Sequence, residues 1–126
     1  NGCLLLHLGE ADCVIASAHS GQVIVDHGTV DIATSRACAE AAEAKGAHFL
    51  DAPISGGPGG ASAGTLTIMV GGSEDAFELA HEYFAKMGAN VKLMGATGAG
   101  TAMKLINQLL VGVHSVAAAE AFALAN

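Results

Sequence analysis

Short β-branched or apolar runs alternate with helix-like segments along most of this chain of 126 residues. Apolar runs of this length, bounded by turn-forming residues, predict buried strands. Strands that alternate with helices at this spacing indicate an α/β sheet with parallel pairs, because each helix carries the chain back along the sheet. The predicted strands are Val23–Asp26, His48–Ala52, Thr65–Val70 and Val91–Met94.

Capping residues mark two of the predicted helices. Asp31 is a favourable N-cap, and the Ala-rich helix after it is expected to continue to about Lys45 and to stop at Gly46. Ser73 is the predicted N-cap of a second, amphipathic helix, which Gly88 ends.

A third and much longer helix is predicted from about Thr101 onward. It is apolar almost all round, so we expect it to be buried in a larger body. A membrane span is the alternative for Leu105–Leu124, which is long enough at about 1.5 Å per residue. Asn107, Gln108 and Glu120 lie inside that stretch, and polar residues of this kind disfavour a span.

The composition excludes two further classes of protein. With 52% hydrophobic and 13% charged residues, the chain has the makeup of a packed globular protein and not of a disordered one. Its formal net charge of −7, with five Lys and Arg residues in all, excludes the basic patch that nucleic-acid binding requires. We therefore expect no nucleic-acid partner. Because of the polar residues in the long helix, we expect no membrane partner either.

The cysteines and the chain ends bear on location. Cys3, Cys13 and Cys38 are odd in number and show no C-x-x-C spacing, which disfavours a disulfide framework or a zinc site. No signal peptide is recognisable, so we expect a cytoplasmic location, or a mitochondrial one if an upstream transit peptide exists. The chain begins without Met and stops inside the long helix, and we interpret it as part of a longer protein.

The segment Pro53–Gly64 is dense in Gly, Ser and Pro, which predicts a loop directly after a strand. Ligands in open α/β sheets bind just beyond the carboxyl ends of the strands. Gly56 and Gly57 let the backbone approach a ligand closely, and Ser55 adds a hydroxyl donor, so the loop is a candidate to hold a carboxylate. A plain flexible connector is the alternative that composition leaves open.

Neither common phosphate-binding motif occurs in the chain. The segment Gly98–Met103 begins as G-x-G but has the wrong final residue for G-x-G-x-x-G, and no G-x-x-x-x-G-K-[ST] is found. This absence matters because a dinucleotide-binding domain needs such a turn for the pyrophosphate.

Lys104 is the sharpest single candidate for chemistry. Asn107 and Gln108 follow it by three and four residues, so the three side chains share one face of the long helix. A lysine with two amides behind it favours a functional role over the alternative, a lysine that extends its amine to water at a helix start. His27 follows a strand and is a candidate to line a site, whereas the histidines as a group show no metal-binding spacing.

Two linked motifs carry a resemblance to a known family. They are Asp51-Ala-Pro-Ile-Ser-Gly-Gly and Gly98-Ala-Gly, the latter followed by Lys104-Leu-Ile-Asn-Gln. With these motifs the sequence resembles the β-hydroxyacid dehydrogenase family. The match continues through Val23–Thr29, Gly64–Gly72 and Ala118–Phe122, so it covers nearly the whole chain.

The resemblance implies a fold and an activity. Residues 1–96 would form the later part of a Rossmann-like NAD(P)-binding domain, and residues 97–126 would begin an all-helical substrate and oligomerisation domain. The implied reaction is hydride transfer between NAD or NADP and a small β-hydroxy acid or sugar acid, such as 3-hydroxyisobutyrate, tartronate semialdehyde or threonate. A homo-oligomer is the implied assembly.

The resemblance also implies residue roles. Lys104 matches the catalytic lysine of the family, and Thr29 matches the position that contacts the nicotinamide end of the cofactor. The implied substrate-binding residues are Ser55, Gly56, Gly57, Asn107 and Gln108, and no metal is implied.

The sequence departs from the family pattern in places. His27 and Gly28 precede Thr29 where a Ser-Thr pair is more usual, and Ile32 stands where a proline is common. The glycine-rich pyrophosphate turn is missing. A truncated or non-catalytic NAD(P)-binding module of the same fold is therefore the alternative, although the retained Lys104 favours an enzyme.

Overall fold

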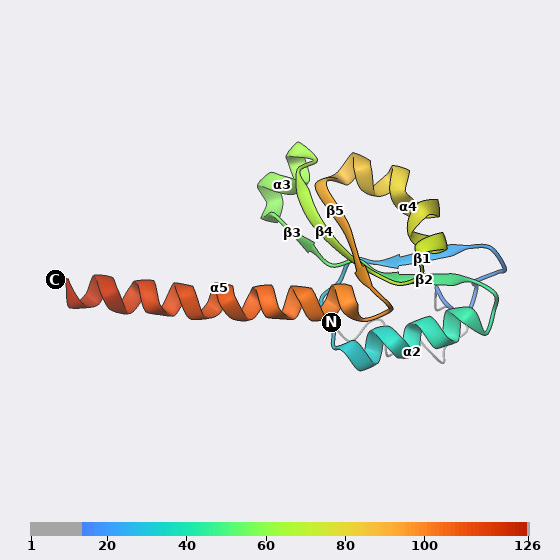
Figure 1. Ribbon diagram of the computed structural model, residues 1–126, viewed down its shortest axis with the longest axis horizontal. Coiled ribbons are helices and arrows are strands. Elements are labelled where there is room, and N and C mark those ends of the chain that lie inside the picture. The colour runs from blue at the N-terminus through green and yellow to red at the C-terminus, as the bar shows by residue number, and fades with distance from the viewer. Residues whose placement is uncertain (1–13, 126) are drawn as a thin grey trace.

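A mixed five-stranded sheet lies between two helices, and a third, much longer helix leaves it at one edge (Figure 1). This is a computed structural model, and it describes residues 14–125. The elements are β1 (Val23–Asp26), α2 (Ile32–Glu43), β2 (His48–Asp51), β3 (Ile54–Ser55), α3 (Gly57–Ala63), β4 (Leu66–Gly71), α4 (Glu74–Met87), β5 (Gly88–Gly95) and α5 (Ala99–Leu124).

The strand order is β1-β2-β4-β3, with β5 also paired to β4. The predicted parallel pairs are found between β1 and β2 and between β4 and β5. β4 is antiparallel to both β2 and β3, which the alternation of strands and helices did not predict. The connection from β2 to β4 contains β3 and a helix of seven residues, so the chain doubles back on itself instead of making a long helical crossover.

Two apolar clusters form, one on each face of the sheet. Phe49 and Leu50 are neighbours on β2 and belong to different clusters, because successive side chains of a strand point to opposite faces. Leu50 packs with α4, and Phe49 packs with α2, which lies on the other side of the sheet in Figure 1. The α4 cluster comprises Leu50, Ala52, Leu66, Ile68, Val70, Ala76, Ala80 and Phe84.

Both predicted N-caps are confirmed. The Asp31 carboxylate accepts hydrogen bonds from the Thr34 amide at 2.9 Å and from the Thr34 hydroxyl at 2.6 Å. The hydrogen bond from that hydroxyl is the main reason why the pKa of Asp31 is lowered. The Ser73 hydroxyl accepts from the Ala76 amide at 3.3 Å. α2 ends at Glu43, slightly before the predicted Lys45.

The prediction of a loop over the whole of Pro53–Gly64 is wrong. Ile54 and Ser55 pair with β4 as a short strand, and α3 follows at once with Pro58 in its first turn. Gly64 then ends the helix in the left-handed conformation, with φ of 66°. Composition concealed both elements, because the pairing of β3 depends on β4 and Pro is favourable at a helix start.

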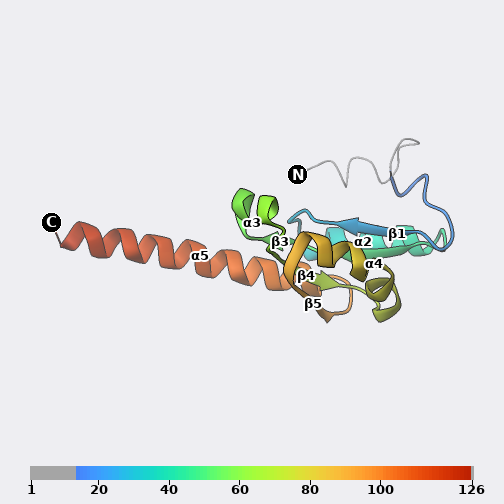
Figure 2. The ribbon, with the colours of Figure 1, turned by 90° about the horizontal axis from the view of Figure 1, so that it is seen from above.

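α5 projects far from the sheet in both views (Figures 1 and 2). Its buried residues are Gly100, Thr101 and Lys104, and from Leu105 to its end nearly all its side chains are exposed. By length and composition alone α5 also qualifies as a membrane span, with a mean hydropathy of 1.3 over an 18-residue window. A core helix of a soluble protein meets the same criterion.

Candidate functional site

The buried Asp51 carboxylate holds the first turn of α5 against the end of β2. One oxygen accepts from the Gly98 amide at 2.7 Å, and the other accepts from the Thr101 amide at 2.8 Å. Gly98, the N-cap, has no side chain that could satisfy these amides, so Asp51 supplies the cap from a distant part of the sequence. The Thr101 hydroxyl also meets the Ser35 hydroxyl of α2 at 3.1 Å.

Glycines allow this helix start to approach the sheet closely. A Cβ on Gly100 would collide with the Met69 carbonyl and would lie 2.6 Å from the Asp51 carbonyl. A Cβ on Gly71 would lie 2.8 Å from the Gly100 amide. The obstructing atoms are mostly backbone, so they cannot turn aside. Gly100 thus has a packing role at a position where the sequence showed only an imperfect phosphate-binding motif.

β4 links the substrate-loop candidates to α5. The Met69 amide donates to the Pro53 carbonyl at 3.1 Å, and the Met69 carbonyl faces Gly100 at the start of α5. Ser55 pairs with Thr67, two residues before Met69. Thr67, which pairs with the loop, and Met69, which faces α5, therefore lie roughly 7 Å apart along β4, because a strand advances by about 3.3 Å per residue. The segment from Pro53 to Gly57 and the first turn of α5 are therefore neighbours.

Lys104 lies one turn beyond the anchored Thr101, on the same face of α5. It is 9% exposed, and it is the last residue of the helix to be buried. The two hydrogen bonds from backbone amides to Asp51 fix the rotation of the helix about its axis, and hence the direction in which this face points. A buried lysine is uncommon in proteins, which makes Lys104 a candidate functional group.

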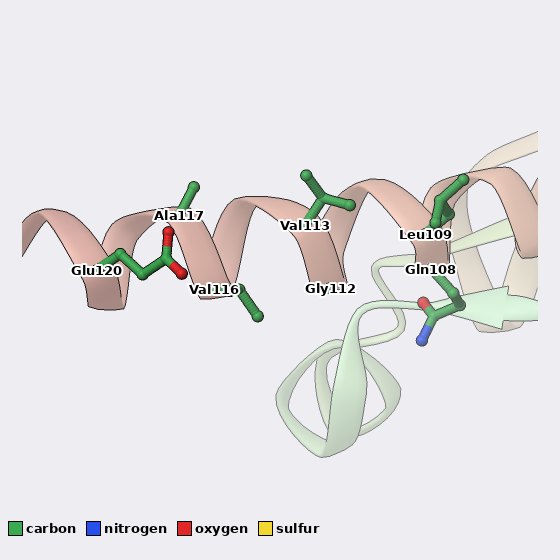
Figure 3. Close-up of a pocket in the computed structure, with 7 residues that line it drawn as sticks. All are labelled: Gln108, Leu109, Gly112, Val113, Val116, Ala117 and Glu120. Carbon is green, nitrogen blue, oxygen red and sulfur yellow. The ribbon is translucent and has the colours of Figure 1, made fainter.

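The two amides behind Lys104 are progressively more exposed. Asn107 is half-buried and Gln108 is exposed, and the Asn107 amide donates to the Gln108 oxygen at 3.4 Å. In Figure 3 the Gln108 side chain points to the side of α5 on which α3 lies. Gln108 also begins an open apolar groove along the exposed helix, which is lined by Gln108, Leu109, Gly112, Val113, Val116, Ala117 and Glu120.

The loop after β1 contains the third group of predicted residues. Gly28 and Thr29 are exposed at the carboxyl end of the parallel pair β1 and β2. The loop leads into α2, where the Ile32 side chain lies against Gly98, the cap of α5. Gly28 and Thr29 thus lie at a strand end of the kind at which ligands bind in open α/β sheets.

Sequence reasoning missed the residues that position the site. Asp51 was noted as the start of a motif, and its role as the cap of α5 was not predicted. Its partners lie 47 and 50 residues away, so no local pattern reports the contact. Ser35 and Gly71 were missed for the same reason. Among residues 14–125, no group of three or more His, Cys, Asp or Glu side chains could hold a metal ion.

Comparison with known proteins agrees with this arrangement. Residues 6–95 match the family model of the NAD-binding domain of 6-phosphogluconate dehydrogenase. The chain is 42% identical to human mitochondrial 3-hydroxyisobutyrate dehydrogenase over 90% of its length, and 43% identical to 2-(hydroxymethyl)glutarate dehydrogenase of Eubacterium barkeri over 88%. The solved structure of Mycobacterium tuberculosis 3-hydroxyisobutyrate dehydrogenase with L-serine superposes with a TM-score of 0.84 at 39% identity, over 89% of this chain.

The chain spans somewhat more than a third of these proteins, with 34%, 37% and 38% of their lengths covered. The family model covers most of the chain, including β1 to β5 and the motif that begins at Asp51. The mixed sheet flanked by helices, followed by one long helix, has the architecture of the superposed structure. The chain therefore belongs to the family of the NAD-binding domain of 6-phosphogluconate dehydrogenase, among the β-hydroxyacid dehydrogenases.

Proposed function

We propose that this chain is part of an oxidoreductase that transfers a hydride between NAD or NADP and a small β-hydroxy acid or sugar acid. The proposal rests on Lys104, which is buried one turn beyond the junction of α5 with the carboxyl end of β2. The names of the two curated relatives, both dehydrogenases of hydroxy acids, support the substrate class. The family model supports the cofactor.

The proposed reaction separates a hydride from a proton. In the oxidative direction the carbon that bears the hydroxyl loses a hydride, the hydroxyl loses a proton, and a carbonyl remains. A bound nicotinamide supplies the hydride acceptor. Lys104 is the proposed acid/base: its neutral amine takes the hydroxyl proton at Nζ, and its ammonium form returns a proton to the developing alkoxide in the reverse direction. The anchored first turn of α5 fixes the position of that amine, and a catalytic group that is already oriented lowers the barrier of the reaction.

We assign the substrate carboxylate to Ser55, Gly56 and Gly57. Gly56 and Gly57 have positive φ angles of 136° and 62°, and a Cβ at Gly57 would meet open space. The backbone there is uncovered and free to receive an anion at the start of α3. The further proposed contacts are Asn107 and Gln108 for orienting the substrate and Thr29 for the nicotinamide end of the cofactor.

The domain division of the longer protein is also a proposal. Residues 1–96 belong to the NAD(P)-binding domain, and residues 97–126 begin a helical domain that completes the substrate site. The exposed apolar surface of α5 supports a further helical body around it. We propose a cytoplasmic or mitochondrial homo-oligomer as the assembled enzyme.

Replacement of Lys104 tests the proposed function. In the longer protein that contains this chain, Lys104→Ala should lower kcat by about 100-fold or more, because general acid/base catalysis contributes roughly that much. Cofactor affinity, measured by fluorescence titration, should stay within a few-fold of the parent. Steady-state kinetics with 3-hydroxyisobutyrate and with sugar acids would identify the substrate.

Lys104→Arg is the matched control for charge. Arginine keeps the positive charge and the length but does not lose its proton, so it should be about as inactive as the alanine variant. A kcat close to that of the parent in Lys104→Ala would contradict the catalytic assignment. A parent protein that binds the cofactor but turns over no hydroxy acid would instead favour a non-catalytic binding module.

A further inference from the structure

The hydrogen-bond ladder between β1 and β2 changes character at its carboxyl end. Asp26 pairs in register with Asp51, and the Ala52 amide donates to the Asp26 carbonyl at 2.7 Å. In a parallel ladder the next bond would run from the Gly28 amide to the Ala52 carbonyl. Instead, the Gly28 amide turns back and donates to the Asp26 carboxylate at 2.8 Å. The Ala52 carbonyl is thereby left open to another donor.

The side chain of His27 forms a hydrogen bond with that carbonyl. Its Nδ1 lies 2.7 Å from the Ala52 oxygen. A carbonyl oxygen can only accept, so Nδ1 carries the proton in this contact. The ring also meets Phe84 of α4 edge-on, with centroids 6.0 Å apart. Phe84 is almost fully buried, so the imidazole is held between a fixed core residue and the end of β2.

His27 therefore joins the two loops that carry the proposed ligand contacts. Two residues after it comes Thr29, and directly after Ala52 comes the segment Pro53 to Gly57. The Pro53 carbonyl is bound to β4 through the Met69 amide, which fixes the other side of that segment. A Cβ on Gly28 would lie 2.9 Å from the Asp26 carboxylate, so a larger residue there would displace the group that accepts from the backbone amide of residue 28.

We propose that His27 is a positioning residue that sets the substrate loop relative to the loop at the nicotinamide end. This inference rests on the proposed function, because it takes the two loops to bind acid and cofactor. His27 acts through the Ala52 carbonyl. Both the neutral Nδ1–H form and the imidazolium can donate this hydrogen bond, so the link between His27 and Ala52 is present in either form.

The first test is spectroscopic and needs no activity. Long-range proton–nitrogen correlation NMR on protein with labelled histidine reports which ring nitrogen bears the proton. The neutral His27 ring should show the Nδ1–H tautomer, and His27→Asn should remove the signal and so assign it. The exposed His81, whose ring meets Phe77 in an edge contact, is the internal reference. An Nε2–H tautomer at His27 would overturn the inference.

The second test compares two substitutions in the longer enzyme. His27→Phe keeps a ring against Phe84 but lacks the donor, whereas His27→Asn places an amide donor near the position of Nδ1. Loss of one hydrogen bond should raise the KM for the acid about fivefold to tenfold in His27→Phe. The KM for the cofactor should change much less, and His27→Asn should recover most of the loss.

The outcomes separate the inference from the proposed function. Equal KM values for the acid in parent, His27→Phe and His27→Asn, with only melting temperatures altered, would show a merely structural role and overturn the inference. A parent enzyme without turnover of any hydroxy acid would overturn the proposed function, and the positioning role would fall with it. The tautomer measurement would then still report on the joint between His27 and Ala52.

Discussion

At the scale of single residues, the substrate-loop candidates differ in what they tolerate. Gly57 has φ of 62°, in the left-handed region, and no atom lies within 4 Å of a Cβ built on it. A side chain there meets backbone strain and no steric obstacle. Asn and Asp are the non-glycine residues that enter this region most readily. They also have nearly the same shape and differ in charge, which makes them a matched pair.

Gly57→Asp should raise the KM for the hydroxy acid strongly, by about tenfold or more, because a carboxylate next to a bound carboxylate is repelled. Gly57→Asn should raise it much less, since it brings the same backbone strain without the charge. Steady-state kinetics on the longer enzyme measures both. If the KM for the acid stays constant in Gly57→Asp while cofactor affinity collapses, the loop is a cofactor element and our assignment of it is wrong.

Residue-level prediction succeeded where the chemistry is local. Asp31 and Ser73 are predictable as caps because a cap needs only one polar side chain and the backbone amide three residues further along the chain. Asp51 shows the limit. In the sequence it is only the first residue of a motif at the end of a predicted strand, whereas both hydrogen bonds of its carboxylate go to the start of a helix about 50 residues later. The roles of Lys104, Thr29 and Ser55 to Gly57 stay predictions until they are tested.

At the scale of elements, β4 and the start of α5 determine the geometry of the candidate site. The sequence predicted most strands and helices, because apolar periodicity and caps are local. It did not predict β3, which exists through pairing with Thr67 and Ile68, nor the antiparallel direction of β4. Both depend on contacts between segments. The Gly-rich composition that suggested a loop in fact permits the turns on either side of α3.

The contact of α5 with the sheet can be tested by two glycine substitutions. Gly100→Ala should lower the free energy of unfolding by about 3 kcal/mol, because its methyl group meets the backbone of Met69 and Asp51. Gly112→Ala, also in α5, meets nothing within 4 Å and should raise helix stability by up to about 1 kcal/mol. Urea denaturation followed by circular dichroism measures both.

The same pair separates local from tertiary effects. If Gly100→Ala is as stable as Gly112→Ala, α5 is not held as closely to β4 as the structure indicates. If Gly100→Ala alone is destabilised in the longer enzyme, its kcat should fall too, because Lys104 lies on the same helix four residues on.

At the scale of the whole molecule, the described residues leave most of α5 uncovered, and its burial in a larger body stays a prediction. Nearly all its side chains beyond Lys104 are exposed, although many are large and apolar. Each large apolar side chain left in water forgoes roughly 1.5–3 kcal/mol of burial free energy. The exposed large apolar residues of α5 are Met103, Leu105, Ile106, Leu109, Leu110, Val111, Val113, Val116, Phe122 and Leu124.

An exposed apolar surface of this extent drives association. We therefore expect the 126-residue chain to form oligomers or aggregates at protein concentrations on the order of tens of micromolar. Light scattering on the purified chain measures this. Replacing Leu109 and Val113 with Lys should shift the population towards monomer, because both line the groove on α5. The matched control replaces Leu79 and Tyr83 of α4, which have the same spacing and are 59% and 70% exposed, and it should leave association unchanged. A stable monomer of the parent chain would show that α5 finds its burial within these residues, against the expectation that a further helical body or a second subunit covers it.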